Sequence, residues 1–127
     1  MLISVLKCKI HRATVTDAQL HYQGSITIDR ELMEHAGLKP FEKVMVVSLD
    51  SGERLETYVI EGEYKSGDII LNGAAARKIL KGDKVIIMAF TAMDEKEYGN
   101  YKPAIITVDE YNKITRDEYK LKKDDDC

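Results

Sequence analysis

The dipeptide Gly24-Ser25 is the position in this sequence whose chemistry could change the chain itself. A serine hydroxyl can attack the carbonyl carbon of the preceding residue, which converts the peptide bond into an ester through an oxyanion intermediate. Glycine before the serine helps because it tolerates a strained backbone. Gly-Ser is also common in ordinary turns, so the surrounding residues must decide between a turn and a reactive site.

Ser25 would become a cofactor precursor if that ester formed. Loss of the α-proton and β-elimination would leave dehydroalanine at position 25, which hydrolyses to a pyruvoyl group and ammonia and leaves two chains. A pyruvoyl ketone forms a Schiff base with the α-amine of an amino acid and accepts the electrons released when carbon dioxide leaves, as pyridoxal phosphate does elsewhere. Neither pyridoxal phosphate nor a metal would then be needed.

Three side chains in one short segment suit such a reaction. Arg54 could bind a substrate carboxylate through two parallel hydrogen bonds, although an arginine after a turn is more often solvated. Thr57 could stabilise the oxyanion of the cleavage step and Tyr58 could donate a proton, yet Thr-Tyr is also ordinary strand composition. Apolar–polar alternation across residues 54–61 predicts a strand with Thr57 and Tyr58 on opposite faces.

Two other segments carry candidate groups. Alternation across residues 6–15 predicts a strand on which Lys9 and His11 point the same way. Asn72 is a good helix N-cap, and the small residues after it would let a ligand carboxylate approach backbone N–H groups, although capping alone explains the asparagine. The three histidines and Cys8 lack the paired spacing of a zinc site, so we predict no metal.

The elements that must position these groups recur in two rounds. The segments Ile26–Asp29 and Ile69–Asn72 match, and each precedes a predicted short helix, a turn and a strand. This pattern indicates an internal duplication, which within one small domain favours a closed pseudo-symmetric β-barrel over a solenoid. The predicted strands are 6–15, 26–28, 44–49, 54–61, 69–71, 85–90 and 104–108, and the predicted helices are 30–36 and 72–80.

The composition bounds the class of protein. The chain of 127 residues, with 44% hydrophobic and 32% charged residues, predicts one globular domain over residues 1–115 and a charged, disordered tail over residues 116–127. A net charge of −3 without a basic stripe argues against nucleic acid. No apolar run is long enough for a membrane span or a signal peptide, so we expect a cytoplasmic protein in which Cys8 and Cys127 are free thiols.

Five motifs in register resemble the bacterial pyruvoyl-dependent aspartate 1-decarboxylases, and the likeness runs from about Leu6 to Phe90. Their order and spacing match that family, which makes them far more specific together than any one of them. They are Lys9-Ile10-His11-Arg12-Ala13-Thr14-Val15-Thr16, Leu20-His21-Tyr22-Gln23-Gly24-Ser25, Arg54-Leu55-Glu56-Thr57-Tyr58, Asn72-Gly73-Ala74-Ala75-Ala76 and Gly82-Asp83-Lys84-Val85-Ile86-Ile87.

The resemblance implies a fold, an assembly and a reaction. It implies a mainly β, six-stranded double-psi β-barrel with short helices, assembled as a homotetramer. It also implies conversion of L-aspartate to β-alanine and CO2 for pantothenate synthesis. The zymogen would cleave itself into a β chain of residues 1–24 and an α chain of residues 25–127. Some members of the family need a helper protein to mature, so a maturation helper is a possible partner.

The resemblance also assigns roles to individual residues. It implies Ser25 as the pyruvoyl source, Tyr58 as the proton donor, and Gly24, Ser25 and Thr57 in self-cleavage. The implied substrate-binding residues are Lys9, Arg54, Thr57, Gly73, Ala74 and Ala75. The implied supporting residues around the site are His11, Tyr22 and Asn72.

Two alternatives stay open from the sequence. A pyruvoyl enzyme could act on another amino acid such as glutamate, because an arginine recognises a carboxylate without fixing the length of the carbon chain. A barrel of this kind could also be a binding domain without enzymatic activity, in which Gly24-Ser25 is an ordinary turn, because fold does not determine function.

Overall fold

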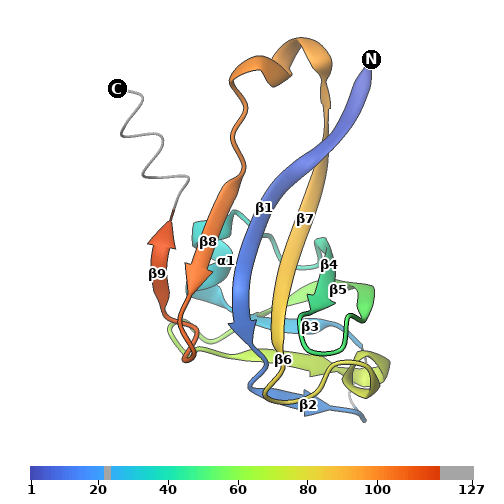
Figure 1. The fold of residues 1–127 in the computed structure, drawn as a ribbon, viewed down its shortest axis with the longest axis vertical. Coiled ribbons are helices and arrows are strands. Elements are labelled where there is room, and N and C mark those ends of the chain that lie inside the picture. The colour runs from blue at the N-terminus through green and yellow to red at the C-terminus, as the bar shows by residue number, and fades with distance from the viewer. Residues whose placement is uncertain (22–23, 118–127) are drawn as a thin grey trace.

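The computed structural model describes residues 1–21 and 24–117, and strands dominate it. Two short 3-10 helices and one α-helix connect the strands (Figure 1). The elements in chain order are β1 (Leu2–Thr14), β2 (Asp17–Gln19), β3 (Ile26–Asp29), α1 (Arg30–Ala36), β4 (Lys43–Ser48), β5 (Arg54–Gly62), β6 (Ile69–Asn72), η1 (Gly73–Arg77), β7 (Lys84–Asp94), η2 (Glu95–Asn100), β8 (Ala104–Val108) and β9 (Ile114–Asp117).

The strands form one sheet that returns on itself. Their order is β2-β6-β3-β5-β4-β7-β1-β8-β9. Strand β2 follows β1 after only Val15 and Thr16, which bond to Asp83 O at 2.9 Å and Ile69 O at 2.8 Å, so β1 and β2 close the ring as one bent strand. The mainly β class of the prediction is confirmed. The described sheet has nine strands rather than six, because β1–β2 is divided and β8 and β9 extend beyond the ring.

A pseudo-two-fold relation joins the two predicted repeats at the strand pair β3–β6. These strands run antiparallel with Thr27 opposite Ile70, and their burial patterns are identical. The residue after each strand's last apolar position bonds to the other repeat: Asn72 N donates to Ser25 O and Asp29 N donates to Asp68 O, both at 2.9 Å. The pairing places Gly24-Ser25 of one repeat in correspondence with Gly67-Asp68 of the other.

Alternation along the strands separates a buried inner face from an outer face. Ile10, Ile87 and Val46 lie in register across β1, β7 and β4 and are fully buried. The neighbouring row contains Lys9, Met88, Met45 and Glu56, so these side chains lie on the outer face. The core also includes α1, which contributes Leu32 and Met33. Cys8 is a buried free thiol whose pKa is raised by burial to about 11.

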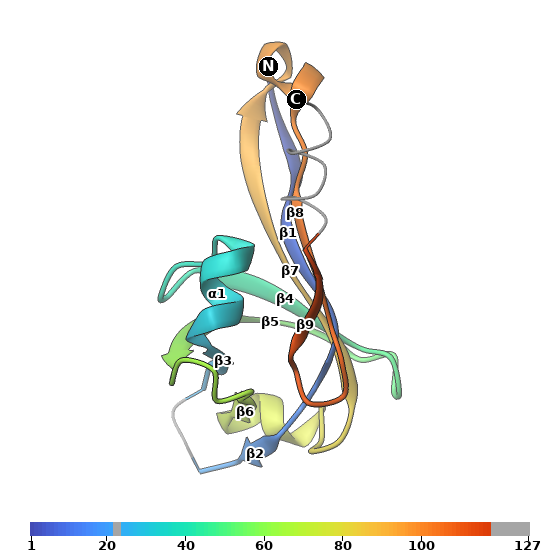
Figure 2. The same ribbon diagram turned by 90° about the vertical axis from the view of Figure 1, so that its left-hand side faces the viewer.

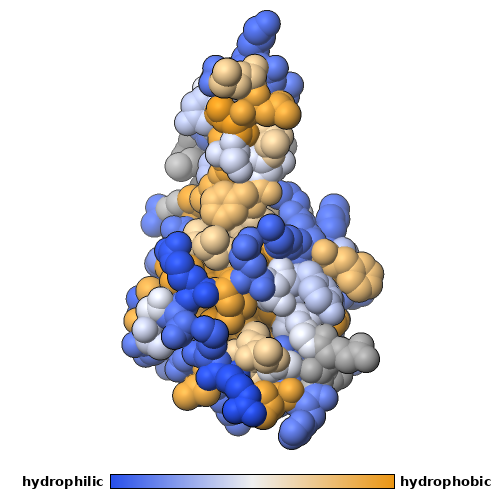
Figure 3. All heavy atoms as spheres, turned by 90° about the vertical axis from the view of Figure 1, so that its right-hand side faces the viewer, coloured by the Kyte–Doolittle hydropathy of each residue, from blue (hydrophilic) through white to orange (hydrophobic). Residues whose placement is uncertain are grey.

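The upper halves of β1 and β7 continue past the ring as a two-stranded arm. Figures 1 and 2 show this arm rising above the barrel, with η2 at its tip and the N-terminus beside it. Met1, Leu2 and Phe90 are exposed large hydrophobic residues of the arm. Figure 3 shows apolar atoms on this projecting part of the surface. An exposed apolar surface of this kind is typical of protein contacts.

The C-terminal boundary differs from the predicted one. Arg116 and Asp117 belong to β9, which pairs antiparallel with β8, so the first two residues of the expected tail are ordered. Asp117 Oδ2 lies 3.0 Å from Nδ1 of His35 on α1, which connects β9 to the helix. The rest of the predicted tail, residues 118–127 with Cys127, lies outside the described residues. In the described part of the chain, no helix combines the length and apolar character that a bilayer span requires.

Asp29 caps α1, as its sequence position predicts. It also anchors the loop of the second repeat. Its buried carboxylate accepts backbone hydrogen bonds from Glu31 at 2.8 Å, Lys65 at 2.9 Å and Gly67 at 2.9 Å. Gly37 closes the helix with φ +79, the left-handed conformation expected of it. These bonds fix the loop that corresponds to the Gly24-Ser25 loop.

We predict that Asp29→Ala lowers the free energy of unfolding by about 2 to 4 kcal/mol, because the cap is lost and buried N–H groups lose their acceptor. Urea unfolding followed by circular dichroism measures this. Glu110→Ala, at an exposed position, is the control and should change stability by less than about 0.5 kcal/mol. Equal effects of the two substitutions would contradict the anchoring role of Asp29.

Candidate active site

Ser25 occupies a backbone conformation that serine rarely adopts. Its φ is +91, and Gly24 before it has φ +66. A Cβ at Gly24 would meet no neighbouring atom, so the backbone angle alone favours glycine there. The corresponding residue of the other repeat, Asp68, has no positive φ. Of these two corresponding residues, Ser25 alone has the strained conformation, and it follows the bond predicted to break.

Asn72 holds the hydroxyl of Ser25. Its Nδ2 donates to Ser25 Oγ at 2.9 Å and to Thr27 Oγ1 at 3.0 Å, and both Ser25 and Asn72 are about 1–2% exposed. Asn72 is the N-cap residue of η1, as predicted, but its side chain makes no capping hydrogen bond there. A donor on Oγ favours the negative charge that this oxygen carries when it has lost its proton and is ready to attack the Gly24 carbonyl carbon.

Ser25 lies beside a pocket of about 280 Å³, a volume at the small end of ligand sites. β5 forms one wall, and the start of η1 forms the other. Lys78 is the one cation among the described lining residues, and its Nζ lies 3.4 Å from Glu53 Oε2. The lining residues are Gly24, Ser25, Leu55, Glu56, Thr57, Asn72, Ala74, Ala75 and Lys78.

The predicted site residues divide between two faces of the sheet. Thr57, Ala74 and Ala75 line the pocket with Ser25, as the predicted roles require. Gly73 is buried and turns the chain between Asn72 and the two alanines with φ +70. Strand alternation puts Arg54 and Tyr58 on the opposite face of β5 from Thr57.

Lys9 and His11 lie on the outer face as well, Lys9 opposite Met88 of β7 and His11 opposite Thr107 of β8. Arg54 shares that face, where its Nη1 lies 3.9 Å from Met45 Sδ. The outer face thus carries Lys9, His11, Arg54 and Tyr58 together, whereas Ser25 and Thr57 lie at the pocket. Tyr22, predicted to support the site, lies outside the described residues.

His11 is held toward its neutral form. Its pKa lies below the ordinary value of about 6.5, because burial penalises the imidazolium and the charges of Lys9 and Arg12 repel it. Its Nδ1 is buried without a hydrogen-bond partner among the described residues. Lys9 and Arg12 place positive charge beside His11, which suits a ligand that carries carboxylates. Within residues 1–21 and 24–117, no three His, Cys, Asp or Glu side chains are placed to hold a metal ion.

Four residues near the site were not predicted from the sequence. Lys78, Leu55 and Glu56 line the pocket, and Phe41 places its ring centroid 6.5 Å from that of Tyr58. Lys78 follows η1 and Leu55 is an inward strand residue, so neither carries a local signal of function. Phe41 had one weak signal: the bulky apolar residue follows Pro40 in a turn, where polar residues are usual.

Comparison with known proteins places the chain. The family model described as aspartate decarboxylase matches residues 1–115. The chain belongs to the aspartate decarboxylase family. Similar proteins named aspartate 1-decarboxylase come from Caldicellulosiruptor bescii, with 61% identity over 91% of both chains, and from Leptospira biflexa, with 55% identity over 89% of this chain and 97% of the other. A solved structure of the computationally designed protein msDPBB_sym2 aligns with TM-score 0.40 and 21% identity over 68% of this chain and 98% of the other.

We predict that Asn72→Asp slows cleavage at Gly24-Ser25 in this aspartate decarboxylase family member by about 100-fold, since an ionised carboxylate replaces the donor to Ser25 Oγ. The uncleaved fraction is followed over time by gel electrophoresis. Asn100→Asp, at an exposed position of η2, should cleave at the wild-type rate. Wild-type cleavage by Asn72→Asp would remove the amide from the reaction.

The depressed pKa of His11 predicts a specific loss of stability in acid. Below about pH 6.5 the unfolded chain binds a proton at His11 that the folded protein binds less well. Folding stability from this group is therefore complete above pH 6.5 and falls as the pH drops through that value. His11→Gln should lose less stability than wild type between pH 7.5 and pH 5 in urea unfolding. A parallel loss in both proteins would show that His11 is not desolvated.

Proposed function

We propose that this chain is the precursor of a pyruvoyl-dependent lyase that decarboxylates L-aspartate to β-alanine and CO2. The observation that carries the proposal is the geometry of Ser25: a buried serine at φ +91 after Gly24, with its hydroxyl bonded to Asn72. Membership of the aspartate decarboxylase family gives the substrate class.

Self-cleavage uses groups of the chain and one molecule of water. Ser25 Oγ attacks the carbonyl carbon of Gly24, and the peptide nitrogen leaves it and takes a proton, which gives an ester. Thr57 lines the same pocket and stabilises the oxyanion of this step. Removal of the Ser25 α-proton then breaks the Cβ–Oγ bond, and Oγ leaves as part of the Gly24 carboxylate. Water replaces the remaining imine nitrogen, so ammonia is released and a ketone stays at position 25.

The residues around Ser25 fit this product. The ketone needs no charged partner, and the pocket walls at Leu55, Ala74 and Ala75 are apolar and small. When present, the pyruvoyl group supplies an electron-withdrawing ketone that binds the amine of the substrate. The pocket excludes bulk water from Ser25, whose exposure is about 1%. A volume of about 280 Å³ suits a small amino acid.

The outer face supplies the groups that the pocket lacks. Lys9 and Arg54 bind the carboxylates of the substrate, and the hydroxyl of Tyr58 donates the proton that replaces the lost carboxyl group. These residues lie on the opposite face of the sheet from Thr57. We infer that a second copy brings its outer face against the Ser25 pocket, as a homotetramer would allow. The exposed apolar arm supports such an assembly (Figure 3).

The cellular context follows from the proposed activity. The product, β-alanine, would serve pantothenate synthesis in the cytoplasm. A helper protein for maturation is compatible with the buried position of Ser25. Glutamate is the substrate to compare with aspartate, since both carry two carboxylates, and the proposal requires faster turnover of aspartate.

We predict that Ser25→Ala abolishes both cleavage and CO2 release, whereas Tyr58→Phe cleaves normally and decarboxylates at least about 10-fold more slowly, because only the second step needs the proton. Release of labelled CO2 from aspartate measures turnover. Tyr64→Phe is the matched control, an exposed tyrosine near Arg30 on another part of the surface. Normal turnover by Tyr58→Phe would exclude it as proton donor, and cleavage without Ser25 would overturn the cofactor assignment.

A further inference from the structure

Phe41 adopts a conformation that costs stability. Its φ is +71, in the left-handed region that a bulky side chain seldom enters, and the ring is 77% exposed. Glycine or asparagine would occupy this position with less strain. An exposed ring in a strained backbone contributes little to folding, so its use must be sought in what the ring touches.

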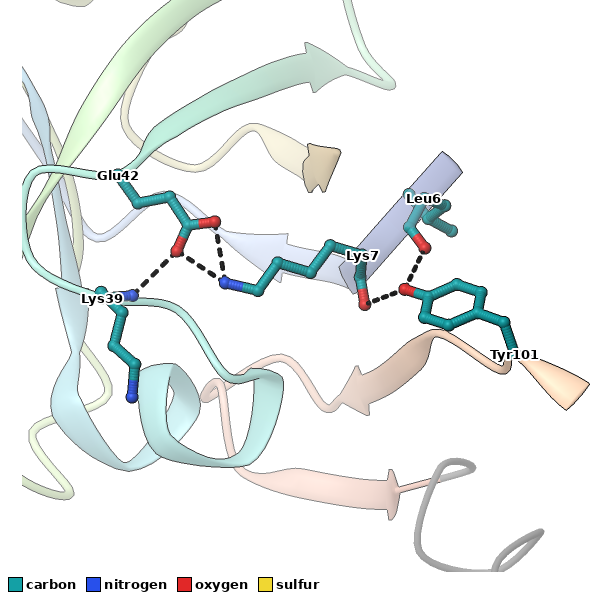
Figure 4. A network of polar contacts seen from close by, with 5 residues as sticks. All are labelled: Leu6, Lys7, Lys39, Glu42 and Tyr101. Atoms are coloured by element: carbon teal, nitrogen blue, oxygen red, sulfur yellow. Dashed lines mark hydrogen bonds and ion pairs between the residues drawn. The ribbon is translucent and has the colours of Figure 1, made fainter. Parts of the chain in front are cut away.

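The surrounding turn holds Phe41 in place from both sides. Phe41 N donates to Val59 O at 2.8 Å, and Val59 N donates to Glu42 O at 3.0 Å. The Glu42 carboxylate accepts from Lys39 N at 3.0 Å and from Lys7 Nζ at 2.9 and 2.8 Å, as Figure 4 shows. The turn is thereby bonded to β5 by its backbone and to β1 by a half-buried ion pair. The bonds to β5 and β1 together hold the backbone at Phe41 in its left-handed conformation.

Lys7, the β1 partner of Glu42, is itself held in place. The strand has a register shift between Leu6 and Cys8, so Lys7 lies at an irregularity opposite β7. The Tyr101 hydroxyl donates to Leu6 O at 2.7 Å beside it (Figure 4). The position of Lys7, and through it of Glu42, therefore depends on the pairing of β1 with β7 and on the bond from Tyr101.

The ring of Phe41 packs against Tyr58. The two centroids are 6.5 Å apart with the planes inclined by 35°, which is within the range of attractive aromatic pairs. Tyr58 is 38% exposed, and it precedes Val59, whose backbone is bonded to the same turn. The turn thus fixes both the backbone after Tyr58 and one side of its ring.

We propose that Phe41 is a positioning residue that holds the Tyr58 ring in the orientation its proton transfer requires. This inference rests on the proposed function, in which the Tyr58 hydroxyl protonates the product. Phe41 itself contacts no reacting atom. The Glu42–Lys7 pair maintains the strained turn. Glycine or asparagine at position 41 would relieve the strain but would have no ring to place against Tyr58.

The test uses two substitutions at one position in the cleaved, full-length protein. Phe41→Asn relieves the backbone and removes the ring, so the melting temperature should stay the same or rise by a few degrees. Its kcat for aspartate should fall between about 2- and 10-fold while KM stays within about twofold, a range that corresponds to the loss of one aromatic pair. The separate variant Phe41→Tyr keeps the ring and should have the wild-type kcat.

A double substitution separates positioning from a general structural effect. In a Tyr58→Phe background, Phe41→Asn should cause no further loss of kcat, because the hydroxyl that it positions is gone. The cleavage rate at Gly24-Ser25 should be the same in all variants, since Phe41 lies outside that pocket.

Three results would overturn the inference: wild-type kcat in Phe41→Asn, the same fold-loss in both backgrounds, or a fall in kcat matched by a fall in melting temperature that Phe41→Tyr does not share. A wild-type protein that neither cleaves nor releases CO2 would overturn the proposed function and this inference with it. An active wild type with an unaffected Phe41→Asn would overturn only the positioning role.

Discussion

The hydrogen bond from the Asn72 amide to the Ser25 hydroxyl joins the two repeats at the point where the chemistry is proposed to occur. It depends on the antiparallel pairing of β3 with β6, which brings residues 47 positions apart into contact. The same pairing orders the backbone on both sides, through Asn72 N to Ser25 O and Asp29 N to Asp68 O. The ring of strands and the inner core are arranged around this crossing.

The two repeats use equivalent positions in opposite ways. Asp29 is an acceptor for three backbone N–H groups and fixes the loop that ends at Gly67, whereas Asn72 is a donor to side-chain hydroxyls of β3 and its preceding residue. The Asp29 carboxylate stabilises its loop by accepting backbone hydrogen bonds. The Asn72 amide, at the equivalent position, donates to a hydroxyl that becomes negatively charged in the proposed cleavage. The loops differ in this partner and in the residue that it faces, Ser25 in one repeat and Asp68 in the other. The second face of β5 carries Arg54 and Tyr58, and the proposed function therefore requires a second copy to bring them to the Ser25 pocket.

Much of this arrangement follows from the sequence. The period-two alternation of 6–15 and 54–61 predicts β1 and β5 and puts Thr57 and Tyr58 on opposite faces, and the Asp29–Gly37 signals delimit α1. Local sequence patterns do not predict the contacts of a residue where partners far away in the sequence determine them. Asn72 has the residue type of an N-cap, but its tertiary partners Ser25 and Thr27 take the amide instead. The irregularity at Lys7 and the strain at Phe41 involve residues far away in the sequence. Lys7 lies beside the bond from Tyr101 and binds Glu42, and Phe41 is bonded to Val59.

The central claim is that Ser25 ceases to be serine, and the intact mass of the purified wild-type protein tests it most directly. The account predicts two chains, residues 1–24 and residues 25–127, with the larger one lighter by one molecule of ammonia than simple hydrolysis would leave it. A single uncleaved chain under conditions that support turnover, or a larger fragment that begins with a free serine amine, would contradict it.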